Sequence, residues 1–238
     1  TSASTPEVLQ TLKRYTPIFV SSKVIMKPLS LLQIDSMVVI ETQGDVFDSL
    51  FQVERKYLTQ VGRMRRSEFS AVRHCARAAL SYLGYERPVM VPGLAGEPTW
   101  PEGVAGSMTH CPSYCAAAVA PSDVYKSIGI DAEPNESLSS GMLERIASFS
   151  ERTHVQTLSN KLPNVAFDRL LFCIKESVYK AWFHRFGECL RFKSINVNIE
   201  VCGSLHFVVA SNVTVRFNQL GYWNEDGGIL GSVVAFYA

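Results

Sequence analysis

Three short segments of the sequence combine acidic, basic and hydroxyl side chains at spacings that could support chemistry. They read SMTHC (107–111), GIDAE (129–133) and KESVYKAW (175–182). Each is weak by itself, because Asp-x-Glu occurs by chance in many proteins. A Glu four residues before a Lys is likewise an ordinary pair on a helix surface, worth about 0.2–0.5 kcal/mol. The three segments therefore indicate a functional site only if the fold brings them together.

Metal-assisted phosphoryl transfer is the chemistry that the three segments would support jointly. Asp131 and Glu133 point to the same side if their segment is a strand, because side chains alternate along a strand. With Glu176 from a helix, they would offer the carboxylate oxygens that Mg²⁺ prefers. Lys175 and Lys180 could then meet phosphate charge. In such a site cations stabilise charge while a base orients the attacking hydroxyl.

Zinc binding is an alternative for the first segment, since His110, Cys111 and Cys115 are soft ligands close in sequence. No second Cys/His pair at structural-site spacing accompanies them, so a phosphate-binding or hydrogen-bonded role for Thr109 and His110 fits better. The six cysteines are scattered, without the density of a disulfide framework. This pattern predicts a reducing, cytoplasmic setting.

Two helices are predicted from apolar periodicity. The first carries apolar residues from Phe69 to Leu83 and is followed by Gly84 as a stop signal. On its polar side Arg66, Arg73 and Arg77 fall within about 40° of one another, which predicts a solvated cationic face. The second helix spans 167–186, with Gly187 as its stop and with Arg169, Glu176 and Lys180 opposite the apolar face.

Short alternating runs predict strands in the rest of the chain. They lie at 116–120 and 127–133 and, after residue 195, in the segments INVNIEV, LHFVVA, VTVRF and ILGSVVAFY. Candidate breaks are the Pro/Gly-rich stretch 91–103 and the turn 121–123. The sequence therefore predicts an α+β fold with largely antiparallel sheets.

Composition limits the class of protein. Of the 238 residues, 47% are hydrophobic and 19% are charged, which suits a globular protein of one large domain or two small lobes. The net charge of +1 predicts no global attraction to nucleic acid or membrane. Neither an export signal nor a membrane span is predicted. A nucleic-acid-binding module that uses the arginines at 63, 65, 66, 73 and 77 is the competing interpretation, but it leaves the acidic cluster unexplained.

The three segments, in this order, resemble the 4′-phosphopantetheinyl transferases, in the subgroup that activates siderophore and polyketide synthases and type I fatty-acid synthases. GSMTHC, SIGIDAEP and FCIKESVYKAWF are similar to three blocks of that family. RRSEFSAVRHCARAAL and GEPTWPEG look like the arginine helix and the Gly-x-Pro loop of actinobacterial-type members. The resemblance runs from about Arg65 to Trp182. The chain departs from the family pattern in 91–98, VPGLAGEP, which lacks the lysine expected before that loop.

The resemblance implies a pseudo-twofold pair of similar lobes, each a small, largely antiparallel sheet packed with helices. The N-terminal lobe would be 1–121, with the arginine helix and a Thr-His loop. The C-terminal lobe would be 122–238, with the Asp-x-Glu strand end and the Lys-Glu-x-x-x-Lys helix. Coenzyme A would bind in the cleft between them. Because both lobes belong to one chain, a monomer is expected.

The resemblance also implies an activity, the transfer of the 4′-phosphopantetheine arm of coenzyme A to a serine of an acyl or peptidyl carrier protein. Adenosine 3′,5′-bisphosphate would be released. Asp131, Glu133 and Glu176 would bind Mg²⁺, with Mn²⁺ as a possible substitute. Glu176 would deprotonate the acceptor serine, directly or through water, and Lys180 would hold phosphate. Glu176, Asp131 and Lys180 are therefore the expected catalytic residues.

Further residues are expected to bind coenzyme A. Lys175 would approach its pyrophosphate, while Arg65, Arg73 and His110, with Thr109 beside them, would engage its 3′-phosphate end. The acceptor is expected to be a protein surface rather than a small molecule. The segment 141–149 is a candidate to receive an acidic carrier helix.

Overall fold

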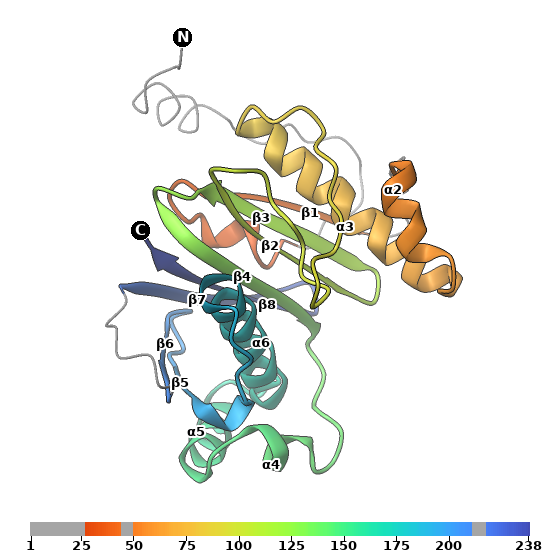
Figure 1. Ribbon diagram of the computed structural model, residues 1–238. Coiled ribbons are helices and arrows are strands. Elements are labelled where there is room, and N and C mark those ends of the chain that lie inside the picture. The colour runs from red at the N-terminus through yellow and green to blue at the C-terminus, as the bar shows by residue number, and fades with distance from the viewer. Residues whose placement is uncertain (1–26, 44–49, 211–217) are drawn as a thin grey trace.

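The computed structural model describes residues 27–43, 50–210 and 218–238, which form antiparallel sheets with helices packed against them (Figure 1). The strands are β1 (Val38–Gln43), β2 (Val104–Cys111), β3 (Tyr114–Pro121), β4 (Tyr125–Pro134), β5 (Ile195–Ile199), β6 (Leu205–Val209), β7 (Gln219–Asp226) and β8 (Ile229–Tyr237). The helices are α2 (Gln52–Arg55), α3 (Arg63–Tyr82), α4 (Met142–Ile146), α5 (Phe149–Lys161) and α6 (Phe167–Phe186). This mixture confirms the predicted α+β class.

The first sheet has the order β1-β3-β2, and α3 covers one of its faces (Figure 1). Its central strand β3 is buried on both sides. Ala117 and Val119 pack toward α3, whereas Ala116, Ala118 and Ala120 pack into the apolar layer shared with the second sheet. Because alanine is small, neighbouring layers can approach β3 closely from both sides.

The second sheet has the order β4-β8-β7, and α6 packs against β4 and β8. The two sheets meet where β2 lies beside β4. There the hydroxyl oxygens of Ser107 and Thr109 accept hydrogen bonds from the backbone N–H groups of Ile130 and Ala132, at 3.0 and 3.1 Å. Side-chain hydroxyls therefore connect the two halves of the chain at the level of the predicted site.

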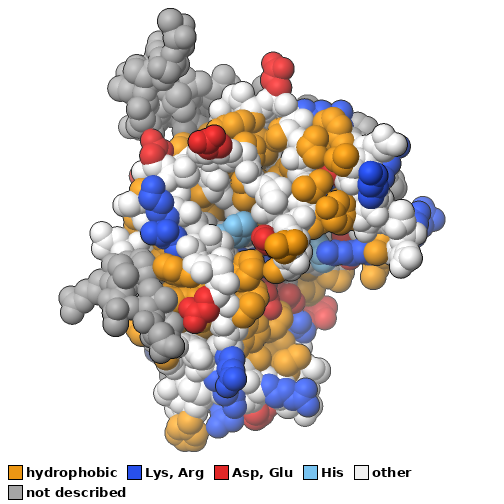
Figure 2. Space-filling view, viewed as in Figure 1, with side chains coloured by type: hydrophobic (Ala, Val, Ile, Leu, Met, Phe, Trp, Pro, Cys, Tyr) orange, Lys and Arg blue, Asp and Glu red, His pale blue; other side chains and the backbone are white. Residues whose placement is uncertain are grey.

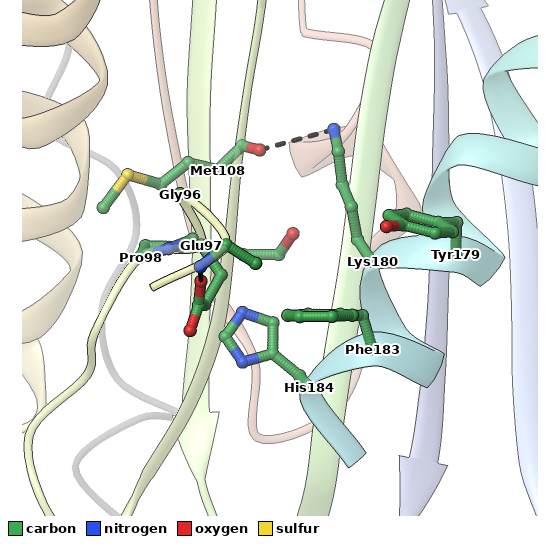
Figure 3. Close-up of a pocket in the computed structure, with 10 residues that line it drawn as sticks. Gly96, Glu97, Pro98, Met108, Tyr179, Lys180, Phe183 and His184 are labelled. Atoms are coloured by element: carbon green, nitrogen blue, oxygen red, sulfur yellow. Dashed lines mark hydrogen bonds between the residues drawn. The ribbon is translucent and has the colours of Figure 1, made fainter. Parts of the chain in front are cut away.

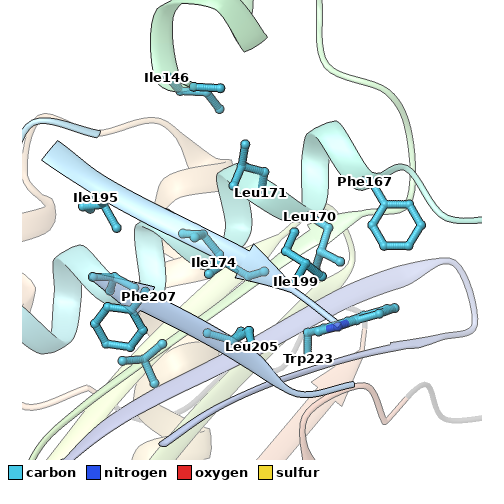
Figure 4. Packing of buried hydrophobic residues seen from close by; sticks show 14 of the residues in the cluster. Ile146, Phe167, Leu170, Leu171, Ile174, Ile195, Ile199, Leu205, Phe207 and Trp223 are labelled. Atoms are coloured by element: carbon cyan, nitrogen blue, oxygen red, sulfur yellow. The ribbon is translucent and has the colours of Figure 1, made fainter. Parts of the chain in front are cut away.

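The largest apolar core lies in the C-terminal half, where α6 packs against α5 and the two-stranded sheet β5-β6 (Figure 4). Phe167 and Trp223 meet edge to face, with ring centroids 5.8 Å apart. This packing fixes the position of α6, whose opposite side carries Glu176 and Lys180.

Most of the predicted elements are confirmed within the described residues. The first predicted helix is α3, and the second has the predicted bounds, 167–186, with Gly187 ending it at a φ of +65°. The strands predicted at 116–120, 127–133, 195–201, 205–210 and 229–237 correspond to β3, β4, β5, β6 and β8. The predicted strand VTVRF, 213–217, lies outside the described residues.

Other elements differ from the predictions or were not predicted. Thr109 and His110 lie within β2, paired with Ala116 and Cys115, so the predicted Thr-His loop is wrong. The strands β1, β2 and β7 and the helices α2, α4 and α5 have no counterpart in the predictions. The proposed lobe boundary at residue 121 falls in the turn between β3 and β4, while the pseudo-twofold relation of the halves stays a prediction.

None of the helices in the described part of the chain has the combination of length and hydropathy needed to cross a bilayer.

Candidate active site

Gly129 sets the distance between β4 and α6. A Cβ atom at this position would lie 1.9 Å from the backbone oxygen of Ser177, so only glycine allows the helix to approach so closely. Asp131 and Glu133 follow on the same side of the strand, at intervals of two residues. The close approach therefore brings the polar side of α6 onto these two carboxylates, as the alternation predicted.

Asp131 is the central side chain of the site. It is 5% exposed, and its Oδ1 accepts hydrogen bonds from Thr109 Oγ1 at 2.9 Å and from Lys180 Nζ at 2.7 Å. Lys180 Nζ also donates to the backbone oxygen of Ile130 at 2.9 Å. Asp131 Oδ2 is buried and has no hydrogen-bond partner among the described residues. A buried carboxylate oxygen without a partner is costly, and it suits a ligand that brings positive charge.

Glu133 and Glu176 interact electrostatically with Asp131. Glu133 forms an ion pair with Arg169 at 3.0 Å, yet its pKa is raised, chiefly by burial and then by repulsion from Asp131. Burial, followed by the same repulsion, also raises the pKa of Glu176. The structure thus places the three predicted carboxylates within electrostatic reach of one another.

A metal ion fits this cluster in part. Among the described residues, no three His, Cys, Asp or Glu side chains already form a metal-binding group. Mg²⁺ usually takes only one or two carboxylates and fills its other positions with water and substrate phosphate. Asp131 Oδ2 is a suitable oxygen for that purpose, whereas Glu133 is engaged by Arg169.

The prediction that Lys175 approaches pyrophosphate is wrong. Lys175 is fully buried, and its Nζ donates to Glu151 at 2.9 Å and to the backbone oxygens of Ile146 and Phe192 at 2.8 and 3.0 Å. The reason is helical phase, because residues 175 and 180 lie about 140° apart around an α-helix. Lys175 therefore joins α6 to α5 on the side away from Asp131.

Arg65 and His110 are brought together, as predicted. Arg65 Nη1 lies 2.7 Å from His110 Nε2, and both contact Glu68, whose Oε2 is 3.4 Å from Arg65 Nη1 and 3.7 Å from His110 Nε2. The pKa of His110 is lowered by burial, against the opposing effect of Glu68. Glu68 was missed from the sequence, although its position three residues after Arg65 was a signal.

Arg73 does not lie on a solvated face. It is 4% exposed, its Nε donates to the Met90 backbone oxygen at 2.9 Å, and its guanidinium lies 3.1 Å from the centroid of the Phe69 ring. Burial lowers its pKa to about 10. Its predicted contact with the 3′-phosphate stays a prediction, because the hydrogen bonds that the structure gives it are internal.

Arg77 is buried as well and forms an ion pair with the buried Glu54. The predicted cationic face of α3 is therefore wrong at both Arg73 and Arg77. In the view of Figure 2, basic and acidic side chains are interspersed rather than gathered into one basic surface. Because Arg73 and Arg77 are buried, neither contributes to the exposed basic patch that the nucleic-acid interpretation requires.

Cys111 and Cys115 are buried thiols. Burial raises their pKa values to about 12 and about 11, so both remain protonated at neutral pH. Zinc binds the thiolate form, so this environment does not suit the zinc alternative.

A cavity of about 230 Å³ opens beside Lys180 (Figure 3). It lies between the loop 95–98, strand β2 and helix α6. Tyr179 and Phe183 stack in its wall, with ring centroids 6.1 Å apart, and His184 faces the loop that carries Glu97. The Gly-Glu-Pro loop and the segments 107–111 and 175–182 were singled out from the sequence, whereas His184 was not. The cavity is thus lined by Lys180, the residue that pairs with Asp131, and by none of the three carboxylates.

Comparisons with known proteins agree with this geometry. The model of the 4′-phosphopantetheinyl transferase N-terminal domain matches residues 53–120, and that of the 4′-phosphopantetheinyl transferase superfamily matches residues 127–226. The two models together match most of the chain and divide it near the turn between β3 and β4.

Curated relatives point the same way. The chain is 43% identical over 160 residues to 4′-phosphopantetheinyl transferase Svp of Streptomyces mobaraensis. The aligned region covers 67% of this chain and 65% of the relative. It is 44% identical over 137 residues to PptT of Mycobacterium tuberculosis, covering 57% and 59% of the two chains.

Npt of Nocardia iowensis is 46% identical over 138 residues, covering 58% of this chain and 60% of its own length. The aligned parts thus span less than two thirds of these three relatives. With two family models in sequence and three actinobacterial transferases at 43–46% identity, the chain belongs to the 4′-phosphopantetheinyl transferase family, in its actinobacterial type.

Proposed function

We propose that this chain transfers the 4′-phosphopantetheine arm of coenzyme A to a serine of an acyl or peptidyl carrier protein, releasing adenosine 3′,5′-bisphosphate. Asp131 carries the proposal, because its Oδ2 is buried, has no partner among the described residues and lies beside Lys180, which lines the cavity. A carboxylate with one unpaired oxygen, next to a cation and an open pocket, suits a phosphorylated substrate that arrives with a metal.

Two groups of side chains serve the donor. Lys180 lies between the carboxylates and the cavity and holds a phosphate of the pyrophosphate. Arg65 and His110 bind the 3′-phosphate, for which the half-exposed guanidinium of Arg65, 55% exposed, is well suited. Guanidinium groups form paired, charge-assisted hydrogen bonds to phosphate oxygens.

Asp131 would hold Mg²⁺, with Glu176 and Glu133 as further ligands, and Mn²⁺ is an acceptable replacement. When bound, the ion offsets the charge that develops on the pyrophosphate. The residues around it have separate tasks. Thr109 fixes Asp131 through its hydroxyl, and Arg169 limits the movement of Glu133.

Glu176 is the proposed proton acceptor. The serine oxygen attacks the phosphorus that carries the pantetheine arm, and the bond from this phosphorus to the leaving bisphosphate breaks. The serine proton passes to Glu176, directly or through a water molecule. Partial burial and the neighbouring acids raise the pKa of Glu176, which makes it a stronger base than an exposed carboxylate.

The acceptor is proposed to be a protein surface. In the candidate segment 141–149 the aromatic ring of Phe149 is 78% exposed, and the guanidinium of Arg152 lies 5.9 Å from it. An exposed aromatic residue beside a cation suits an acidic carrier helix with apolar positions.

Two experiments test the site, one by removing the metal and one by changing the donor. Chelation of divalent ions should abolish transfer, and Mg²⁺ should restore it. The wild type should prefer coenzyme A to 3′-dephospho-coenzyme A in kcat/KM, and Arg65→Ala should lose much of that preference because the phosphate then lacks its partner. Full activity after chelation would reject the metal, and equal use of both donors by the wild type would reject the 3′-phosphate site.

A further inference from the structure

Glu68 lies against Arg65 and His110, the two residues proposed to bind the 3′-phosphate. It comes from the second turn of α3, is 26% exposed, and lies within 4 Å of both Arg65 and His110. A carboxylate in a cluster proposed to bind an anion opposes that binding through its own charge. Neither the transfer reaction nor the metal site assigns this residue a task.

The contacts of Arg65 show how the cluster is satisfied without a phosphate. Its Nη1 donates to His110 Nε2 at 2.7 Å, so in this arrangement that nitrogen is an acceptor and carries no proton. The same Nη1 lies 3.4 Å from Glu68 Oε2. Two internal acceptors therefore face one guanidinium nitrogen, and a phosphate that binds through this nitrogen has to displace at least one of them.

We propose that Glu68 is a built-in counter-ion that competes with the 3′-phosphate of the nucleotide for Arg65 and His110. The inference rests on the proposed function, because it takes the anion to be the 3′-phosphate shared by the donor and the released bisphosphate. Glu68 weakens the hold on that phosphate, and it takes the place of the phosphate beside Arg65 as the product leaves.

This arrangement matters most for product release. The released bisphosphate keeps the group that Arg65 and His110 bind, so tight binding of that group would slow each turnover. An internal carboxylate that stays within reach of Arg65 weakens the binding of the released bisphosphate and so speeds its dissociation. The opposite role, in which Glu68 orients Arg65 for phosphate, predicts a change of affinity with the opposite sign.

The test is a calorimetric titration of the full chain with adenosine 3′,5′-bisphosphate and with adenosine 5′-monophosphate, at low ionic strength to limit screening. Glu68→Gln keeps an acceptor of similar size but removes the charge. It should bind the bisphosphate about five- to tenfold more tightly, the order expected for one removed like charge at a partly exposed site. The monophosphate should bind with unchanged affinity. The control Glu200→Gln removes an exposed charge just after β5, in the other half of the chain, and should change neither affinity.

Equal or weaker bisphosphate binding by Glu68→Gln would overturn the proposal, as would an equal gain for both nucleotides. A wild type that binds both nucleotides alike would overturn it too, since no 3′-phosphate site would then exist. Thermal unfolding of each variant verifies that it is folded. The transfer of the arm to a carrier protein, assayed on the same wild-type preparation, decides the proposed function separately.

Discussion

At the scale of single residues, the site concentrates charge that does not favour folding. Burial and mutual repulsion raise the pKa values of Glu133 and Glu176, so the ionised forms of both are less favourable here than in water. Asp131 adds a buried oxygen with no partner among the described residues. Such arrangements persist where function requires them, and they are relieved when a ligand binds.

Substitutions in the carboxylate cluster should therefore separate activity from stability. Glu176→Gln and Asp131→Asn should each lower kcat at least about a hundredfold, because each removes charge at the proposed metal and base. The Tm of Glu176→Gln should be unchanged or raised by about 2 °C, because a repelled and desolvated charge is lost. Steady-state kinetics and thermal unfolding measure both effects. Near-normal turnover in either folded variant would contradict the assignment.

Lys175 should behave in the opposite way. Lys175→Met leaves the buried Glu151 without its cation and should lower the free energy of unfolding by about 3–5 kcal/mol. Adding Glu151→Gln should recover part of this loss, because the uncompensated charge is then gone. The KM for coenzyme A should stay within about twofold of the wild type, since Lys175 lies away from the site. Normal stability in urea with a raised KM would restore the pyrophosphate role.

The sequence predicted the acids of the site better than its arginines and lysines. Asp131, Glu133 and Glu176 were found because strand alternation and helix position are local properties. Lys175 was assigned through the motif, although its helical phase relative to Lys180 was visible in the sequence. The burial of Arg73 depends on Met90, seventeen residues away, and no local pattern reports such a contact.

At the scale of elements, α6 has two sides with different tasks. Its apolar side fills the C-terminal core (Figure 4). Its polar side presents Glu176 and Lys180 to β4. Gly129 matters for both sides, because the backbone of α6 packs directly against it and this contact fixes the position of the helix. A small shift of the helix would separate Lys180 from Asp131.

Gly129→Ala should therefore damage both packing and catalysis. The new methyl group would overlap the Ser177 backbone oxygen, and the overpacking should cost about 1–3 kcal/mol or more. Transfer should fall together with stability, because α6 must move. Gly62→Ala is the matched control, since nothing lies within 4 Å of its Cβ position and its φ of −66° suits alanine. The control should lose less than about 1 kcal/mol, the helix-cap preference of glycine. Equal effects of both substitutions in urea unfolding would contradict this role of Gly129.

Predictability also varied among the elements. Helices α3 and α6 have long, regular apolar patterns and clear glycine stops, so they were predicted well. Helix α5 was missed because only Glu151, Val155 and Leu158 are buried in it, which gives a weak pattern. Strand β2 was taken for a loop at Thr109 and His110, because polar residues there face the other sheet and the site rather than solvent.

At the scale of the whole molecule, the candidate site lies on the seam between the two sheets. Thr109 and His110 come from the first sheet, Asp131 and Glu133 from the second, and α6 closes the arrangement. The hydroxyl contacts between β2 and β4 hold this seam without a continuous ladder of backbone hydrogen bonds. A substrate bound across the seam would contact both halves of the chain at once.

The most direct test of the account is the mass of a carrier protein after incubation with this chain, coenzyme A and Mg²⁺. Apo acyl and peptidyl carrier proteins should gain the mass of one phosphopantetheine arm, as measured by intact-protein mass spectrometry. The gain should be absent when the acceptor serine is replaced by alanine, and absent with Glu176→Gln. If the folded wild-type chain added no arm to any carrier in such a panel, with Mg²⁺ and coenzyme A in excess, the proposed function would be contradicted.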